Sequence, residues 1–197
     1  MYPKILENLI DSFNSLPGIG KKTAERLAFA VLTLDEEQAV LFSDSIKELK
    51  EKIHPCKECN LLTDQELCNV CSNKERKNIL CVVEDSKNVF LFEKLGMFKG
   101  YYHVLDGLIS PLENINPEDI GLEKLVDRVN NNKFDEIIVA LKPSLEGETT
   151  ALYIKKIFED LNIKITRLAS GIPVGADMEY VDTLTLERAI NDRKEIG

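Results

Sequence analysis

Apolar residues in the first third of the chain recur every three or four positions, which is the spacing of amphipathic helices. One such stretch covers residues 3–16 and is stopped by Pro17, whose ring cannot continue a helix. A second stretch covers residues 22–33, and a third begins at Asp35, where Gln38 stands at the spacing of a capping box. The pattern therefore predicts three successive helices.

The third helix carries a narrow apolar stripe. The apolar residues of this stripe are spaced alternately three and four positions apart. They are Ala39, Phe42, Ile46, Leu49 and Ile53. We expect this stripe to pack onto the first two helices. The alternative is a seam for another subunit, although two heptads are too few to define a coiled coil.

From residue 79 onward the pattern changes, because short β-branched runs alternate with helical stretches. The predicted strands are 79–83, 101–105, 136–141 and 163–169, and the predicted helices between them are 87–95, 121–131 and 148–161. Strands that alternate with helices favour βαβ units and a mostly parallel sheet. The expected fold class is α/β, within a multi-part α+β chain whose last residues form a loop and a short helix outside the sheet.

Composition and charge narrow the function. The chain has 197 residues, 44% of them hydrophobic, which suffices for one domain and a smaller one. No apolar run reaches transmembrane length and the N-terminus lacks a secretion signal, so we expect a cytoplasmic protein. The net charge of -9 excludes a broad basic surface for nucleic acid, which needs many contacts to phosphate. Any nucleic-acid site must be local, and the more acidic C-terminal part favours protein partners.

Four of the five cysteines form two C-x2-C pairs separated by eight residues, at Cys56, Cys59, Cys68 and Cys71. Two such pairs offer four thiolates to one ion, which is typical of a closed structural zinc site. We therefore expect one zinc per chain; a metal-free hairpin or a redox pair is the alternative. Cys81 lies in an apolar strand and is expected to be a buried small hydrophobe. His54 is expected to end the third helix rather than to bind the metal.

Residues 16–28 read LPGIGKKTAERLA and place two glycines and two lysines at the start of the second helix. A P-loop would need glycine at position 15 and Ser or Thr at position 22, but Ser15 and Lys22 stand there and no strand precedes them. A helix–hairpin–helix fits better, because the unpaired N–H groups and the dipole of the second helix can bind a phosphate. The alternative is a plain turn with solvated lysines.

Each residue of this turn has an expected role in DNA binding. The glycines let the backbone approach a ligand closely, the isoleucine fills the space between the helices, and the basic side chains add charge beside a phosphate. The set is Gly18, Ile19, Gly20, Lys21, Lys22 and Arg26. Such contacts hold the DNA backbone without reading its sequence.

The hairpin and the four-cysteine finger are followed by an α/β domain that opens with CVVEDSKNVFLFEKLGMFKGYYHVLDGLISPL. Together with LEGETTALYI and TRLASGIPVGADMEYVDTLTLERAI, these features closely resemble the RecR family of bacterial recombination mediators over essentially the whole chain. The resemblance implies that the chain divides into a helix–hairpin–helix region, a zinc finger, a Toprim domain and a C-terminal segment for subunit contact, at 1–53, 54–72, 79–170 and 171–197.

The resemblance also implies a function and partners. Members of the family are not enzymes, assemble into ring-like tetramers, and act with RecO, and in many bacteria RecF, to load RecA at single-strand gaps in DNA. The family's RecO-contacting acidic positions match Glu84 and the run Glu146, Gly147 and Glu148.

The alternative function is a magnesium-dependent Toprim enzyme, such as a nuclease, primase or topoisomerase. That chemistry needs a glutamate after the first strand, for which Glu84 fits, and a pair of aspartates after a later strand. The later strand runs instead into Lys142 and Pro143, and an ammonium beside the expected metal disfavours its binding. His103 is expected to be a core histidine rather than a base. A structural ring subunit without DNA affinity is a third hypothesis.

Overall fold

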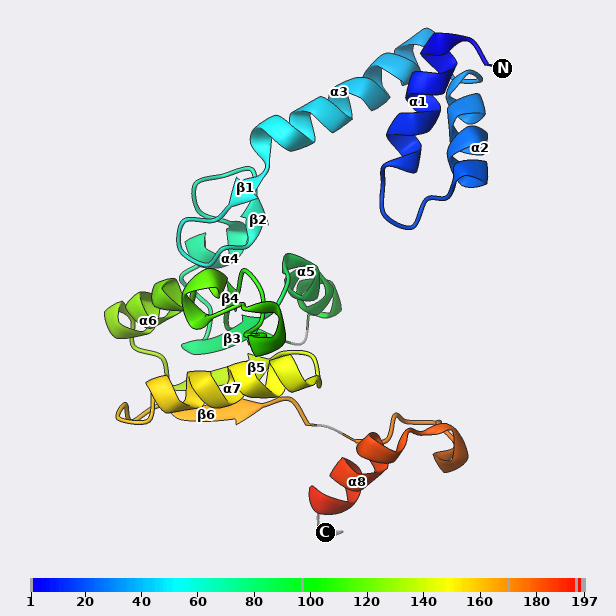
Figure 1. The fold of residues 1–197 in the computed structure, drawn as a ribbon. Coiled ribbons are helices and arrows are strands. Elements are labelled where there is room, and N and C mark those ends of the chain that lie inside the picture. Colours follow the sequence, from blue (N-terminus) through cyan, green and yellow to red (C-terminus); the bar gives the residue numbers. More distant parts are fainter. Residues whose placement is uncertain (1, 97, 170, 194, 196–197) are drawn as a thin grey trace. The chain divides into compact units, whose positions relative to one another are not determined.

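The computed structural model describes residues 2–96, 98–169, 171–193 and 195, and the chain divides into two compact units, Met1–Ile53 and His54–Gly197. The first unit is helical, as the apolar spacing predicts. Its elements are α1 (Lys4–Asn14), α2 (Lys21–Val31) and α3 (Glu36–Lys52) (Figure 1). Helices α1 and α2 pack as a hairpin around Ile10, Ala24 and Ala28, and the two alanines allow the helix backbones to approach closely.

Helix α3 begins as predicted but does not pack as predicted. The Asp35 carboxylate accepts a hydrogen bond of 2.8 Å from the Gln38 amide, which forms the capping box. No residue of α3 is buried, and Phe42, Ile46 and Leu49 are 42%, 54% and 61% exposed. The expected packing of the stripe onto the first two helices is therefore wrong, because their core is filled by their own side chains and by the turn between them.

The second unit is built on a parallel sheet with the strand order β4-β3-β5-β6. The strands are β3 (Ile79–Val83), β4 (Tyr101–Val104), β5 (Glu136–Ala140) and β6 (Lys164–Arg167), and the helices between them are α5 (Ser86–Leu95), α6 (Leu122–Asn131) and α7 (Leu145–Ile157). All three strand pairs are parallel. The predicted α/β class and its parallel sheet are confirmed. Helix α7 begins three residues earlier than expected, because Ser144 caps it by accepting from the Gly147 amide.

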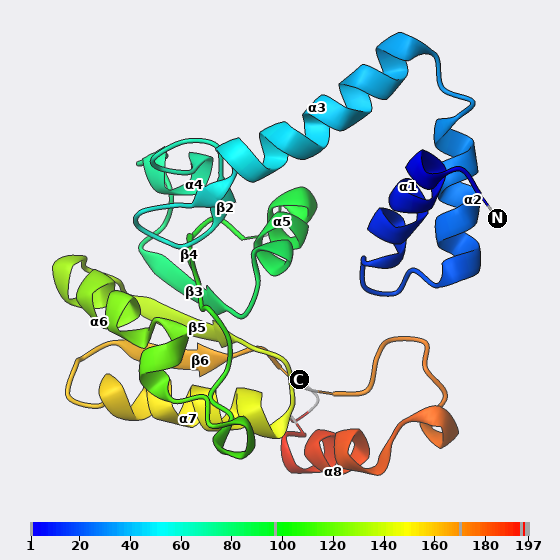
Figure 2. The ribbon, with the colours of Figure 1, turned by 45° about the horizontal axis from the view of Figure 1, so that its top comes forward.

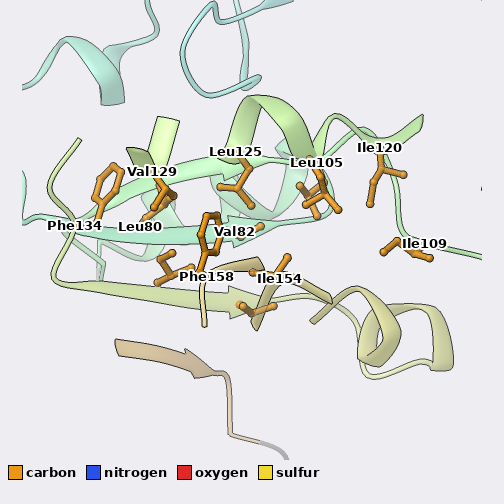
Figure 3. Close-up of a cluster of buried hydrophobic side chains, with 13 residues drawn as sticks. Leu80, Val82, Leu105, Ile109, Ile120, Leu125, Val129, Phe134, Ile154 and Phe158 are labelled. Carbon is orange, nitrogen blue, oxygen red and sulfur yellow. The ribbon is translucent and has the colours of Figure 1, made fainter. Parts of the chain in front are cut away.

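The two faces of this sheet are covered differently. Leu80 and Val82 of β3 point into a core that also takes side chains from α6 and α7 (Figure 3). Cys81 and Val83, the alternate residues, point into a second core with α5 and the cysteine finger. Figure 2 shows α5 and α7 on opposite sides of the strands. The near-continuous apolar strand ILCVV is what a strand buried on both faces requires.

The finger consists of short elements that lie against the edge strand β4. They are β1 (His54–Pro55), β2 (Leu62–Thr63) and α4 (Asn69–Ser72). The Val104 amide of β4 donates a hydrogen bond of 2.9 Å to the Cys59 carbonyl, so the finger continues the hydrogen bonding of the sheet at this edge. His54 is paired with Thr63 in β1, and the expectation that it ends α3 is wrong, because that helix stops at Lys52 to let the chain enter the finger in an extended conformation.

The remaining elements are short. They are the 3-10 turns η1 (Pro111–Glu113), η2 (Pro117–Ile120) and η3 (Met178–Tyr180), and the C-terminal helix α8 (Thr183–Asn191). As predicted, α8 lies outside the sheet, and none of its residues is buried. Within the described residues, no helix combines the length and apolar character needed to cross a membrane.

Candidate zinc centre and nucleic-acid interface

The four cysteines of the finger converge on one point. Their sulfurs lie within 4.8 Å of one another, and all four residues are buried. A tetrahedron of zinc–sulfur bonds of about 2.3 Å has edges of about 3.8 Å. The Cys59 and Cys68 sulfurs are 3.5 Å apart, so the cluster has the dimensions of such a tetrahedron. The site fits one structural zinc with all four positions filled by the protein.

Backbone amides donate hydrogen bonds to two of the four sulfurs. The Cys68 amide donates to the Cys56 sulfur at 3.4 Å, and the Cys71 amide donates to the Cys68 sulfur at 3.5 Å. Hydrogen bonds from Cys59 and then Cys71 hold the pKa of the Cys68 thiol far below its usual range, whereas hydrogen bonds within the same cluster raise the pKa of Cys59 and of Cys71. Without a metal the thiolate, which is the form that binds zinc, is therefore favoured at Cys68 alone among these three.

The turn between α1 and α2 has the geometry that its glycines suggest. Gly18 has a φ of 78°, in the left-handed region that favours glycine. Ile19 packs against the core of the helical hairpin, as expected. Gly20 precedes α2 with ordinary backbone angles, and a Cβ placed there would have no heavy atom within 4 Å. The chain itself does not need glycine at position 20, and the space in front of it is open to a ligand.

The first turn of α2 is suited to an anion. No side chain caps its N–H groups, and it contains no acidic residue. Lys21, Lys22 and Arg26 are exposed on this helix. Free N–H groups, the positive end of the helix dipole and nearby ammonium groups all stabilise a negative charge at the same place.

The acidic candidates on the sheet are largely paired. Strands β3 and β5 are neighbours in the centre of the sheet, and the connections that follow them run in opposite directions, from β3 to β4 and from β5 to β6. The carboxyl ends of β3 and β5 therefore form a topological switch point, where α/β proteins bind ligands. Glu84 lies at this point, and the Lys142 ammonium is 3.1 Å from its carboxylate. An ammonium therefore stands where a catalytic metal would require another carboxylate.

The other acidic candidates differ from one another. Glu148 is held by Arg167 at 3.2 Å and by Arg188 of α8 at 3.4 Å. A hydrogen bond to Ser144 lowers the pKa of Glu146. Among the described residues Glu146 has no ion pair, so it is the carboxylate of this run most available to a partner.

Gly147 has a structural task. A Cβ at this position would lie 2.0 Å from the Lys142 carbonyl oxygen, which belongs to the loop after β5. Only glycine lets the first turn of α7 approach this backbone, and the close approach positions the neighbouring carboxylates of the helix.

Two further titratable residues are buried as expected. Cys81 is 3% exposed, and burial raises the pKa of its thiol to about 12, so it behaves as a hydrophobe. His103 is 1% exposed, and its burial, together with the charges of Arg128 and Lys124, lowers its pKa to about 3. It is therefore neutral, and its Nδ1 atom has no hydrogen-bond partner within the described part of the chain.

The structure adds one residue to the zinc centre that the sequence pattern did not indicate. Arg128 of α6 is buried and donates a hydrogen bond to the Cys71 sulfur at 3.5 Å. An arginine in an amphipathic helix normally faces solvent. No pattern in the neighbouring sequence indicates that Arg128 is buried, because Tyr102 and Cys71, its partners, are 26 and 57 residues away in the chain.

Comparisons with known proteins agree with this order of parts. Residues 6–50 match the family described as "RecR, helix-hairpin-helix", residues 53–73 match the RecR zinc finger domain with four cysteines, residues 78–169 match "Toprim domain", and residues 171–194 match "RecR, C-terminal". The chain is 46% identical over 196 residues to "Recombination protein RecR" of Staphylococcus saprophyticus, with 99% of both chains covered. It is 45% identical, with the same coverage, to the protein of that name from Staphylococcus aureus strain Newman.

Proposed function

The chain belongs to the RecR family of recombination proteins, and on that premise we propose that it is a non-enzymatic mediator that clamps DNA in the cytoplasm. It acts with RecO, and in some bacteria with RecF, to load RecA at single-strand gaps. Its four parts are the helix–hairpin–helix region, the zinc finger, the Toprim domain and the C-terminal segment, at 1–53, 54–72, 79–170 and 171–197.

The geometry of the hairpin turn carries this proposal. Gly20 leaves open space in front of an uncapped helix N-terminus, and exposed basic side chains flank it. One such turn provides few contacts, and the net charge of -9 opposes diffuse binding. A ring-like tetramer brings several turns to one DNA molecule at high effective concentration, which turns weak contacts into useful affinity.

The DNA role is tested with three forms of the full chain. The variant Gly20→Ala should fold normally and bind DNA less tightly, because its methyl group occupies the space that a phosphate needs. The double variant Lys21→Glu/Lys22→Glu should bind more weakly still and show a smaller dependence on salt. The control is Lys47→Glu/Lys50→Glu, which makes the same charge change on α3. Fluorescence anisotropy with labelled DNA at several salt concentrations measures these effects, and unchanged binding by both hairpin variants would refute the role.

We place the RecO contact at the acidic residues Glu84, Glu146 and Glu148, with Gly147 shaping the turn between them. Glu146 is the most available of these carboxylates, whereas the other two are paired with basic side chains. In a pull-down with the organism's own RecO, Glu146→Lys should lose most of the bound RecO, while the control Glu113→Lys on η1 should retain it. Failure of the unmodified protein to bind RecO would remove this part of the proposal.

The absence of catalysis rests on the pair of Lys142 and Glu84 at the switch point. Nicked and primed DNA incubated with the protein and Mg²⁺ should remain unchanged. Turnover that disappears in Glu84→Gln would overturn this view in favour of a Toprim enzyme.

A further inference from the structure

Arg128 connects the sheet to the zinc centre. It extends from α6, and only 3% of its side chain is exposed. One terminal nitrogen donates to the Tyr102 carbonyl of the edge strand β4, and the other donates to the Cys71 sulfur at 3.5 Å. The remaining nitrogen, Nε, is 3.8 Å from the Glu58 carboxylate. Two nitrogens of the guanidinium thus donate to partly negative atoms, and Nε, which has no hydrogen-bond partner among the described residues, has a carboxylate 3.8 Å away.

The charge of the zinc centre explains why a cation belongs there. Four thiolates and one Zn²⁺ carry a net charge of -2, and all four cysteines are buried. A buried charge is expensive unless an opposite charge or hydrogen bonds compensate it. Lys57, the basic residue between the first two cysteines, is engaged with Glu66 at 2.5 Å and is 71% exposed. Arg128 is the buried cation that contacts the sulfur cluster.

Arginine suits this position better than lysine. Its planar fork can donate to two acceptors at once in fixed directions, whereas an ammonium is a single compact charge. Here the fork joins the Cys71 sulfur to the Tyr102 carbonyl, and so joins a zinc ligand to the backbone of the sheet.

We infer that Arg128 is an outer-sphere residue of the zinc site, which neutralises part of the thiolate charge and makes zinc affinity depend on the fold of the Toprim domain. The finger and the sheet already share one hydrophobic core, in which Cys71 lies with Tyr102 and Val104. The arginine adds an electrostatic link to that core. Zinc binding and the docking of α6 at the edge of β4 therefore strengthen each other.

The test is the zinc affinity of the zinc-loaded full chain, measured by competition with a chromophoric chelator. Outer-sphere partners of metal ligands are typically worth about 10- to 100-fold in metal affinity. The variant Arg128→Met keeps much of the side-chain volume and removes the charge, so its zinc dissociation constant should rise by about this factor. The variant Arg128→Lys keeps the charge but cannot serve both acceptors, so its zinc dissociation constant should show a smaller rise.

Arg76 supplies a matched control. Its side chain is also mostly covered, with 9% exposed. It lies 5.8 Å from the centre of the Tyr102 ring and pairs with Glu93 at 2.5 Å. It contacts no cysteine sulfur among the described residues. The variant Arg76→Met should lower the thermal midpoint of unfolding and leave zinc affinity within about twofold of the wild-type value.

The outcomes are distinguishable. A purely structural role for Arg128 predicts that Arg128→Met and Arg76→Met both lower the midpoint and that neither changes zinc affinity. Zinc affinity of folded Arg128→Met within twofold of wild type overturns the inference. If Arg128→Met does not fold, Arg128→Lys decides, and wild-type zinc affinity in that variant overturns the inference equally.

Discussion

His103 and Arg128 are basic residues buried near strand β4, and their surroundings differ. The guanidinium nitrogens of Arg128 lie beside a sulfur, a carbonyl and a carboxylate. His103 is neutral because burial and the nearby charges of Arg128 and Lys124 both oppose its protonation. At the scale of single residues, the side of the sheet next to α6 surrounds the Arg128 guanidinium with negative and partly negative atoms. A second positive charge on that side, on His103, would cost free energy.

His103 should make the protein less stable in mild acid. Its pKa is about 3 in the folded chain, against 6.5 in an unfolded one. As the pH falls from 6.5 toward 3, the unfolded chain binds a proton that the folded chain does not, so stability decreases. The slope is about 1.4 kcal/mol per pH unit well inside this window. Urea unfolding of wild type and His103→Leu at several pH values measures it. The free energy of unfolding of His103→Leu should fall less steeply with decreasing pH than that of wild type, by about that slope. Parallel curves of unfolding free energy against pH would contradict the prediction.

At the scale of elements, local chemistry could be predicted and long-range packing could not. The capping box at Asp35, the strand ILCVV and the cysteine pairs each depend on residues close together in the chain. The position of His54 and the exposed face of α3 depend on what the rest of the chain leaves room for. The predicted start of α7 is wrong although its signal is local, since Ser144 caps the helix by accepting from the Gly147 amide. Arg128 is the extreme case, because its burial results from a finger that arrives from a different part of the sequence.

Gly147 provides a prediction at this scale. A Cβ there meets the Lys142 carbonyl at 2.0 Å, so Gly147→Ala must push α7 away from the loop after β5. Overpacking of this kind costs about 1–3 kcal/mol, which exceeds the gain in helix propensity. Urea unfolding should therefore show a lower free energy of unfolding. Gly171→Ala is the control, because the added methyl group has open space there and the residue caps no helix, so this variant should not lower the free energy of unfolding.

At the scale of the whole molecule, the chain has two units and the zinc belongs to the second. The finger shares a core with β3, β4 and α5 rather than forming a separate domain. The helical hairpin has its own small core. The helical hairpin, which we propose binds DNA, thus has a core separate from the one that contains the four cysteines.

Removal of zinc should consequently loosen more than the finger. Hydrogen exchange measured with and without a strong chelator should show faster exchange in residues 54–72 and also in β4 and α6, because they contact the finger through the shared core and Arg128. Helices α1 and α2 should keep their protection and serve as the internal control. If exchange became faster only in residues 54–72, the finger would not stabilise β4 and α6, and the prediction would be wrong.

The finger's position on β4 has a consequence for the protein's behaviour at high concentration. Strand β4 is an outer strand of the sheet, and the finger satisfies one of its backbone groups, because the Val104 amide donates to the Cys59 carbonyl. An outer strand with free backbone groups invites pairing with another chain, and proteins protect such strands from it. We therefore expect the finger to protect this strand from pairing with another chain, so removal of zinc by a chelator should raise light scattering at high protein concentration.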